Sequence, residues 1–247
     1  MPEHYGARFF GEREAAVYDE QEAGMFDPDI VTPIVDMLAG LAGGGTALEM
    51  GIGTGRIALP LAAHGIRVHG IDASAAMVSK LRAKPGGDDL DVVIGDFSKA
   101  RAGSEFALVY LIFNTIWNLK TQDEQVACFA NAAAHLAHGG HFVIELFVPD
   151  LQRLPPGNDV FVYGVDARTI SFDVYDVVTQ GSTSNHFVVE DDGRVSTYPV
   201  EGRYVWPSEL DLMARLAGMT LRDRWGGWQR EPFTKLSRSH VSVYAKP

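Results

Sequence analysis

Between residues 28 and 147, short apolar runs alternate with longer stretches in which apolar residues recur every three or four positions. This alternation is typical of βαβ units, in which parallel strands lie side by side beneath helices. The expected helices cover residues 54–63, 74–84 and 121–136. The expected strands cover residues 46–50, 66–71, 91–94, 106–112 and 141–147. The pattern therefore predicts an α/β fold with helices on both faces of a parallel sheet.

After Pro149 the pattern changes to an alternation of apolar and polar positions between residues 160 and 205, with a hairpin turn at residues 191–193. This period predicts antiparallel strands. A helix over residues 207–218 and two strands near 221–225 and 241–245 then bring the main sheet to seven, mostly parallel strands. We expect one domain over residues 1–247, composed of a core (28–147), an antiparallel β insertion that covers the substrate side (150–205) and a C-terminal completion of the sheet (206–247).

The charge balance narrows the classes of partner. The chain of 247 residues carries 21 lysines and arginines against 32 aspartates and glutamates, a net charge of −11. An acidic protein repels phosphate backbones, so we expect no nucleic-acid partner. The longest apolar run, residues 106–113, is shorter than the roughly 20 residues that span a bilayer, so we expect no membrane contact. The first six residues lack the segments of an export signal, which favours a cytoplasmic protein.

Metal and disulfide chemistry are not expected either. Cys128 is the one cysteine of the chain, which excludes an internal disulfide and a cysteine-based zinc site. The histidines have no spacing that is typical of metal ligands, and we predict no metal. Two of them, His186 and His240, remain open as general bases.

A glycine-rich loop follows the first strand, as Gly51-Ile-Gly53-Thr-Gly55. Glycines let the backbone approach a ligand closely, and the start of a helix presents free amides to it. A dinucleotide-binding motif would need a third glycine where Arg56 stands, and no Gly-Lys-Ser/Thr sequence for phosphates occurs. A tight strand-to-helix turn without a ligand is the alternative.

Acidic residues follow the next two strands. Asp72 ends the second strand, where a carboxylate can accept hydrogen bonds from both hydroxyls of a ribose. Asp96 follows the third strand and could accept one from an adenine amino group. Either acid alone could be a turn residue, and an NAD enzyme would also have Asp72. Together, behind the glycine loop, they indicate a nucleoside site.

In this order, residues 47–56, 70–72, 95–97 and 106–114 resemble the motifs of class I S-adenosylmethionine-dependent methyltransferases, and the resemblance extends over nearly the whole chain. It implies a Rossmann-like fold and S-adenosylmethionine as the cofactor. The glycines would contact the methionine part, Asp72 the ribose, and Asp96 and Phe97 the adenine, on which Met77 would pack. The implied cofactor-binding residues are Glu49, Gly51, Gly53, Asp72, Met77, Asp96, Phe97 and Phe113.

The acceptor side is less clearly marked. Tyr18-Asp19 resembles a pair at the start of small-molecule methyltransferases such as the aminosugar N-methyltransferases, where the tyrosine reaches toward the reacting methyl group. Asn114 lies in the loop after the fourth strand, and Glu145 ends the fifth strand at the edge where ligands bind. We take Tyr18, Asn114 and Glu145 as catalytic candidates, with core packing, helix capping and a solvated turn as the respective alternatives. The substrate-binding candidates are Trp117, Asn118, His186, Trp206 and Trp228.

These observations predict an enzyme that transfers a methyl group to nitrogen or oxygen of a small-molecule metabolite. Nitrogen is preferred because no histidine stands out as the base that a hydroxyl acceptor would need. The alternatives are an O-methyltransferase of a small hydroxylated or phenolic metabolite, a sensor that binds S-adenosylmethionine without turnover, and an NAD(P) oxidoreductase. The sequence leaves a homo-oligomer open.

Overall fold

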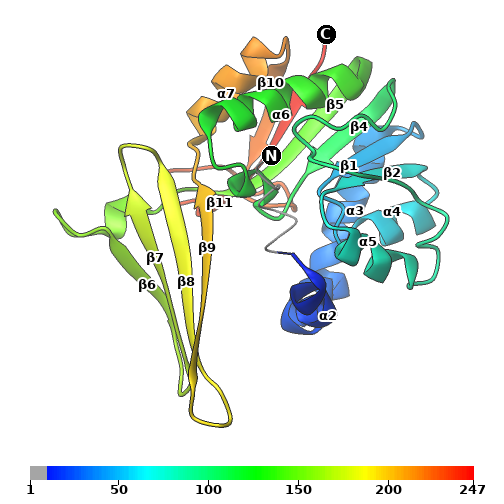
Figure 1. Cartoon of the computed structure of the whole chain (residues 1–247). Helices are drawn as coiled ribbons and strands as arrows, with labels where there is room; N and C mark the ends of the chain where they lie inside the picture. The colour runs from blue at the N-terminus through cyan, green and yellow to red at the C-terminus, as the bar shows by residue number, and fades with distance from the viewer. Residues whose placement is uncertain (1–9) are drawn as a thin grey trace.

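The computed structural model describes residues 10–247, so the first nine residues, on which the expectation about export rests, lie outside it. A seven-stranded sheet forms the centre, in the order β10-β11-β5-β4-β1-β2-β3 (Figure 1). β11 runs antiparallel to its two neighbours, β5 and β10, and the other pairs are parallel. The predicted mostly parallel sheet is confirmed. Its strands are β1 (Ala47–Met50), β2 (Val68–Asp72), β3 (Asp91–Ile94), β4 (Phe106–Leu111), β5 (Leu136–Phe147), β10 (Thr220–Trp225) and β11 (Ser239–Ala245).

Helices cover both faces of this sheet, as the sequence predicts. On one face lie α3 (Pro28–Ala42), α4 (Ala58–Ala63) and α5 (Ala75–Arg82), and on the other α6 (Gln122–His135) and α7 (Pro207–Leu216). Two apolar cores result. Leu38 and Leu61 pack with Tyr110 on the first face, and Phe129 packs with Phe142 on the second. Strands buried on both faces, such as β1, explain the continuous apolar runs in the sequence.

Local sequence signals set the helix ends. The Asp27 carboxylate accepts from the Asp29 amide at 2.9 Å before Pro28 begins α3. α6 starts at the predicted capping box, in which Thr121 and Glu124 satisfy each other's backbone amides. α4 is shorter than predicted, beginning at Ala58 rather than at residue 54, because the glycine loop continues as a turn through Ile57.

Neither α3 nor the helix before it, α2 (Glu12–Gln21), was among the predicted helices, and the short 3₁₀ helix η1 (Ala23–Phe26) lies between them. Ala15 is the buried residue of α2. A helix with so narrow a buried stripe leaves little apolar periodicity in its sequence.

The insertion is a separate antiparallel sheet in the order β6-β7-β8-β9, and it projects from the body of the molecule (Figure 1). Its antiparallel character is confirmed. The indole of Trp117, in the 3₁₀ helix η2 (Thr115–Asn118), donates to the Ser182 hydroxyl at 2.7 Å and fixes the sheet to the body. A further 3₁₀ helix, η3 (Leu151–Arg153), precedes it. The strands are β6 (Val160–Val165), β7 (Thr169–Asp176), β8 (Gly181–Val189) and β9 (Val195–Arg203).

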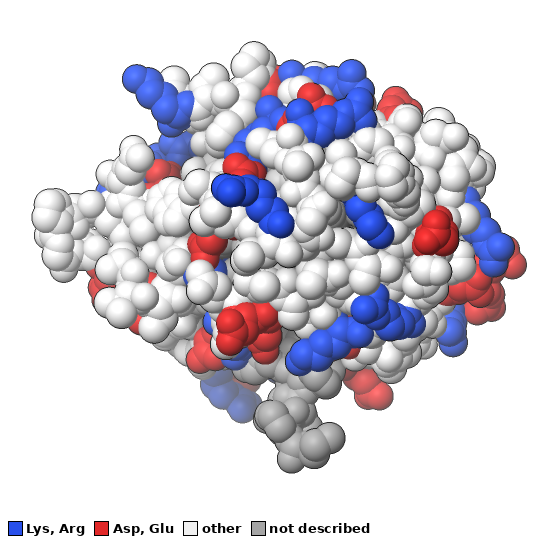
Figure 2. Space-filling view, turned by 90° about the horizontal axis from the view of Figure 1, so that it is seen from above, with Lys and Arg blue, Asp and Glu red and all other residues white. Residues whose placement is uncertain are grey.

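The surface of the body carries scattered charges. The face seen in Figure 2 shows basic and acidic side chains, singly and in small groups, separated by uncharged surface. Over residues 10–247, none of the helices combines the length and the apolar character that crossing a bilayer requires.

Candidate active site

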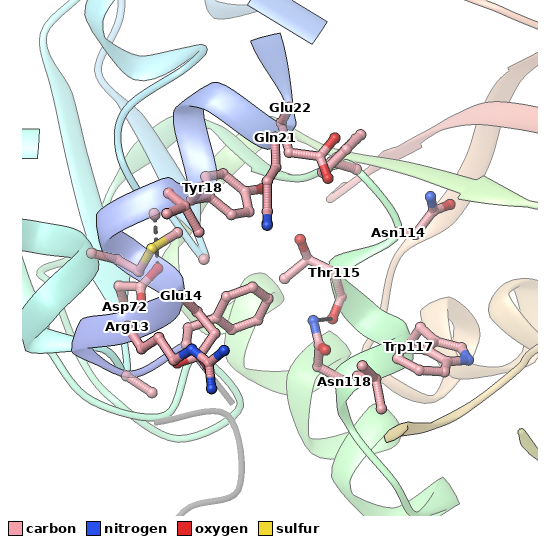
Figure 3. A pocket seen from close by; sticks show the side chains of 18 of the residues that line it. Arg13, Glu14, Tyr18, Gln21, Glu22, Asp72, Asn114, Thr115, Trp117 and Asn118 are labelled. Atoms are coloured by element: carbon pink, nitrogen blue, oxygen red, sulfur yellow. Dashed lines mark hydrogen bonds between the residues drawn. The ribbon is translucent and has the colours of Figure 1, made fainter. Parts of the chain in front are cut away.

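A cavity of about 760 Å³ opens at the edge of the main sheet where its parallel strands end. Ligands bind at this edge in open α/β sheets because the connecting loops diverge there. The cavity has a cofactor half, a wall from α2, and an opposite wall from η2 and the insertion (Figure 3). The cofactor half is lined by Gly51, Gly53, Asp72, Ala73, Met77 and Phe97. The wall formed by α2 and its flanking residues comprises Phe10, Arg13, Glu14, Val17, Tyr18, Gln21 and Glu22. The opposite wall, formed by η2, the turn before it and the insertion, comprises Phe113, Asn114, Thr115, Trp117, Asn118, His186, Val188, Glu190 and Val200.

The glycine loop presents bare backbone to the cofactor half. Gly51 and Gly53 have φ angles of +76° and +55°, which residues other than glycine rarely adopt. A Cβ on Gly51 would lie 2.7 Å from Cγ2 of Thr115, so the position has no room for a side chain. The Gly53 amide donates to Asp72 Oδ2 at 2.7 Å, which fixes the loop against the end of β2.

Asp72 is oriented for a diol. Its two oxygens accept from the amides of Gly53, at 2.7 Å, and Ser74, at 2.8 Å. Burial raises the pKa of this carboxyl, and the two backbone hydrogen bonds oppose the rise. Each carboxylate oxygen keeps a second lone pair, and the residue lines the cavity, so it fits a pair of vicinal hydroxyls.

Two other predicted cofactor residues lie behind the wall. Glu49 is buried beneath the glycine loop, where it accepts from the Tyr110 hydroxyl at 3.0 Å, and burial raises its pKa to about 8. Asp96 does not line the cavity, whereas its neighbour Phe97 does. Burial would raise the pKa of Asp96, but hydrogen bonds from Ser98 and the charge of Lys99 outweigh it and lower the pKa.

α2 is fixed directly to the glycine loop. Asp19 accepts from the Thr54 hydroxyl at 2.6 Å and pairs with Lys84 at 2.5 Å, and Lys84 also donates to the Thr54 carbonyl at 2.8 Å. The Arg56 guanidinium donates to the Met25 carbonyl at 3.3 Å. These contacts tie the wall of the cavity to the loop that would hold the cofactor.

Tyr18 projects from α2 into the cavity (Figure 3). Burial and the nearby carboxylate of Glu22 raise its pKa to about 12. The hydroxyl is therefore neutral at physiological pH, so it acts as a hydrogen-bonding group and not as a base.

The turn after β4 shapes the opposite wall. Phe113 and Asn114 both have left-handed backbone, at φ +57° and +59°. The Phe113 amide donates to Glu145 Oε2 at 2.9 Å, and Asn114 Oδ1 accepts from the Phe147 amide at 2.8 Å. Trp228 donates to the second oxygen of Glu145 at 2.9 Å. Asn114 lines the cavity, but its oxygen serves to hold this turn.

Three of the predicted catalytic and substrate-binding residues also do not line the cavity. Glu145 and Trp228 lie behind the wall, where their mutual hydrogen bond supports the turn after β4. Trp206 precedes α7 and packs edge-on against Tyr204. His240 cannot be the general base that the sequence left open. Its side chain is fully buried in β11, and burial lowers its pKa to about 3.

The other candidates do line the cavity. Trp117 and Asn118 reach it from η2, and His186 reaches it from β8. The His186 ring is held by the Ser171 hydroxyl, 3.1 Å from Nδ1, and by the Tyr163 hydroxyl, 3.3 Å from Nε2.

Several lining residues were missed by the sequence reasoning because α2 was not predicted. They recur every three or four positions around Tyr18, and this helical spacing is the signal that could have found them. They are Phe10, Arg13, Glu14, Val17, Gln21 and, one position further, Glu22.

Comparisons with known proteins agree with this geometry. Residues 47–140 match a family described as a methyltransferase domain. The chain is 37% identical to the CcbJ methyltransferase from Streptomyces caelestis, whose structure superposes with a TM-score of 0.83 over 96% of this chain and 97% of that one. It is 28% identical over 250 residues to a cypemycin N-terminal methyltransferase from a Streptomyces species, covering 93% and 98% of the two chains.

A more distant structure shows the same fold. CalS10, an amino pentose methyltransferase from Micromonospora echinaspora solved with S-adenosylmethionine bound, is 22% identical, with a TM-score of 0.71 over 94% of this chain and 97% of that one. In the present chain, the side-chain-free loop at Gly51, the Asp72 carboxylate and the apolar Met77 and Phe97 fit the methionine, ribose and adenine parts of that cofactor. The chain belongs to the class I S-adenosylmethionine-dependent methyltransferases and uses S-adenosylmethionine as its cofactor.

Proposed function

We propose that the protein methylates an amine nitrogen of a small natural-product metabolite. The charge of the cavity outside the cofactor half carries this proposal. Among residues 10–247, three carboxylates line that part, those of Glu14, Glu22 and Glu190, against one cation, Arg13. Glu14 and Glu22 make no side-chain hydrogen bond or ion pair with another residue in the described part of the chain, so their charge is available to a ligand.

An acidic cavity selects a cationic acceptor. Most aliphatic amines are ammonium ions at neutral pH, and opposite charges about 4 Å apart attract by about 4 kcal/mol at the effective dielectric constant of a protein surface. A phenol or an alcohol gains no such attraction. The similarity to the cypemycin N-terminal methyltransferase and to an amino pentose methyltransferase, whose names imply acceptors with amino groups, supports the same choice.

When bound, S-adenosylmethionine supplies a methyl group on a positively charged sulfur. The protein has to align the acceptor with that group and exclude water. We assign Tyr18, whose hydroxyl stays protonated, to accept a hydrogen bond from the amine and so orient its lone pair. Glu22, whose charge acts on the same hydroxyl, binds the ammonium and receives the proton that must leave before nitrogen attacks.

A labelled-methyl screen tests the proposal. The purified protein is incubated with labelled S-adenosylmethionine and matched sets of small amines, phenols and carboxylic acids. We expect label in the amines. Label confined to phenols or acids would contradict N-methylation, and tight cofactor binding without transfer to any acceptor would indicate a sensor.

The role of Glu22 is tested separately with the amine found. Glu22→Gln should raise the acceptor KM at least about tenfold, which corresponds to about 1.4 kcal/mol, and leave the affinity for S-adenosylhomocysteine unchanged. The matched control is Glu20→Gln. Glu20 lies on α2, its carboxylate is exposed, and it does not line the cavity. Equal acceptor KM values for the two variants would show that Glu22 does not bind the acceptor.

A further inference from the structure

The helix α6 carries two buried side-chain amides, those of Gln125 and Asn131, and neither of them lines the cavity. Gln125 is 0% exposed and Asn131 is 5% exposed. They lie six residues apart, which corresponds to about 9 Å along a helix axis. Burial of a polar side chain is unfavourable unless the group is hydrogen-bonded, so the partners of each amide show which part of the fold it holds.

Gln125 holds the opposite wall of the cavity, which η2, the turn before it and the insertion form. Its amide nitrogen donates to the carbonyl of Arg203 at 3.1 Å and to that of Leu119 at 3.2 Å, and it lies 3.4 Å from that of Ile116. Its amide oxygen accepts from the Arg203 guanidinium at 2.5 Å. Ile116 belongs to η2, Leu119 follows it, and Arg203 ends β9 at the root of the insertion. One side chain therefore joins the two elements of this wall.

The junction between η2 and the insertion is also closely packed. A Cβ on Gly202 would lie 2.2 Å from Cδ2 of Trp117, so the indole lies directly against the backbone of β9. Arg203 is buried, and it pairs with Glu209 of α7 at 2.7 Å. The opposite wall is thus one packed unit, and Gln125 attaches that unit to α6.

Asn131 holds the cofactor half in the same way. Its amide donates to the carbonyls of Phe97, at 2.8 Å, and Ala100, at 3.0 Å. One turn further along α6, His135 Nε2 accepts from the Ala102 amide at 3.1 Å. Phe97 lines the cofactor half, so α6 fixes the backbone of a residue that fits the adenine.

We propose that Gln125 and Asn131 are positioning residues, through which α6 sets the spacing between the opposite wall and the cofactor half. Methyl transfer requires the acceptor atom to be in line with the methyl group, and a misplacement of about 1 Å can lower a rate about 100-fold. A helix of 14 residues that is hydrogen-bonded to both halves limits such displacement. The acceptor part of this inference rests on the proposed function, whereas the cofactor part does not.

Gln125→Met and Asn131→Leu remove each amide and keep the approximate size of the side chain. Asn131→Leu should weaken the binding of S-adenosylhomocysteine at least about fivefold, whereas Gln125→Met should leave it unchanged. Gln125→Met should change the ratio of kcat/KM between a small and a bulky acceptor at least about fivefold, and Asn131→Leu should not. This ratio compares two acceptors on one enzyme, so a smaller folded fraction does not alter it.

The matched control is Gln122→Met, which makes the same change on the same helix. Gln122 is exposed, and its amide donates to Glu209 at 2.8 Å, outside the cavity. This variant should alter neither the affinity for S-adenosylhomocysteine nor the acceptor ratio. If the first pair does not fold, Gln125→Glu, which keeps an acceptor for Arg203, and Asn131→Ser replace it and should show the same division of effects.

Hydrogen exchange gives a second measurement that needs no acceptor. Exchange should rise in residues 115–119 in the Gln125 variant and in residues 97–102 in the Asn131 variant. Equal effects of both variants on both halves, or no effect on either half, would overturn the proposal. If the protein accepts hydroxyl compounds and not amines, the ratio is measured with two of those compounds, and only the proposed function fails.

Discussion

Tyr18 lies on α2, Glu22 follows one helical turn later, directly after the last residue of α2, and both line the cavity. Burial and the glutamate charge keep the tyrosine protonated, with a pKa of about 12. An orienting role therefore predicts a loss in the rate of transfer and not in cofactor binding. Tyr18→Phe should lower kcat at least about tenfold, or about 1.4 kcal/mol, while calorimetry shows unchanged binding of S-adenosylhomocysteine. An unchanged kcat would remove Tyr18 from the reacting geometry.

Glu145 is a positioning residue in this account. Both of its oxygens accept hydrogen bonds, from the Phe113 amide and the Trp228 indole. In Glu145→Gln one acceptor becomes a donor, so one of these groups loses its partner at a cost of about 1–3 kcal/mol. Urea denaturation should show this loss of stability, and the pH profile of kcat should keep its shape. A shift of that pH profile would instead indicate that Glu145 exchanges a proton with the acceptor.

His240 links stability to pH. Its folded-state pKa of about 3 is below the ordinary value of 6.5 because the ring is buried, so the unfolded chain binds a proton first as the pH falls. Stability is therefore present above pH 6.5 and is lost as the pH falls toward 3, by up to about 1.4 kcal/mol per pH unit from this group.

His240→Leu should flatten the pH dependence of stability between pH 6.5 and 4. Ser242, which contacts His240 Nδ1, keeps a hydrogen bond from Arg224 at 2.8 Å in that variant. Equal slopes for the wild type and the variant in denaturation experiments at a series of pH values would contradict the assignment.

At the scale of elements, the position of α2 against the glycine loop depends on the contacts between Asp19, Thr54 and Lys84. Breaking it should loosen the wall of the cavity over the cofactor. Lys84→Met should speed dissociation of S-adenosylmethionine several-fold and raise hydrogen exchange in residues 12–21. The control is Arg67→Met, which removes an exposed ion pair with Asp91 elsewhere in the fold and should change neither. Unchanged dissociation in Lys84→Met would show that α2 does not retain the cofactor.

How far an element could be predicted depended on how much of it is buried. The strands of the main sheet were predicted because burial on both faces demands continuous apolar runs, as in β1. The cofactor half followed, since Gly51, Gly53 and Asp72 come directly after such strands. α2 was not predicted because Ala15 is its buried residue, and the carboxylates of the acceptor wall were missed with it. Glu145 and Asn114 were chosen as catalytic candidates, but the sequence did not indicate that they bind the backbone amides of Phe113 and Phe147, because those partners belong to other segments.

At the scale of the whole molecule, the ends of the strands of the main sheet line the cofactor half of the cavity, while α2 and the insertion line the part that we propose binds the acceptor. The insertion contributes His186, Val188 and Val200 to that part. The acid excess that disfavours nucleic acids is also present locally, in the carboxylates of the cavity. Whole-chain charge and site charge therefore both support the class of acceptor that we propose, a small cation.

The central claim, methyl transfer to an amine nitrogen, is tested most directly by competition between an amine and its hydroxyl isostere. Both compounds share one carbon skeleton and are supplied at equal concentration with S-adenosylmethionine, and the products are identified by mass spectrometry and NMR. Our account predicts that the methyl group appears on the nitrogen of the amine. Methyl transfer to the oxygen of the hydroxyl compound in preference to the amine would contradict it.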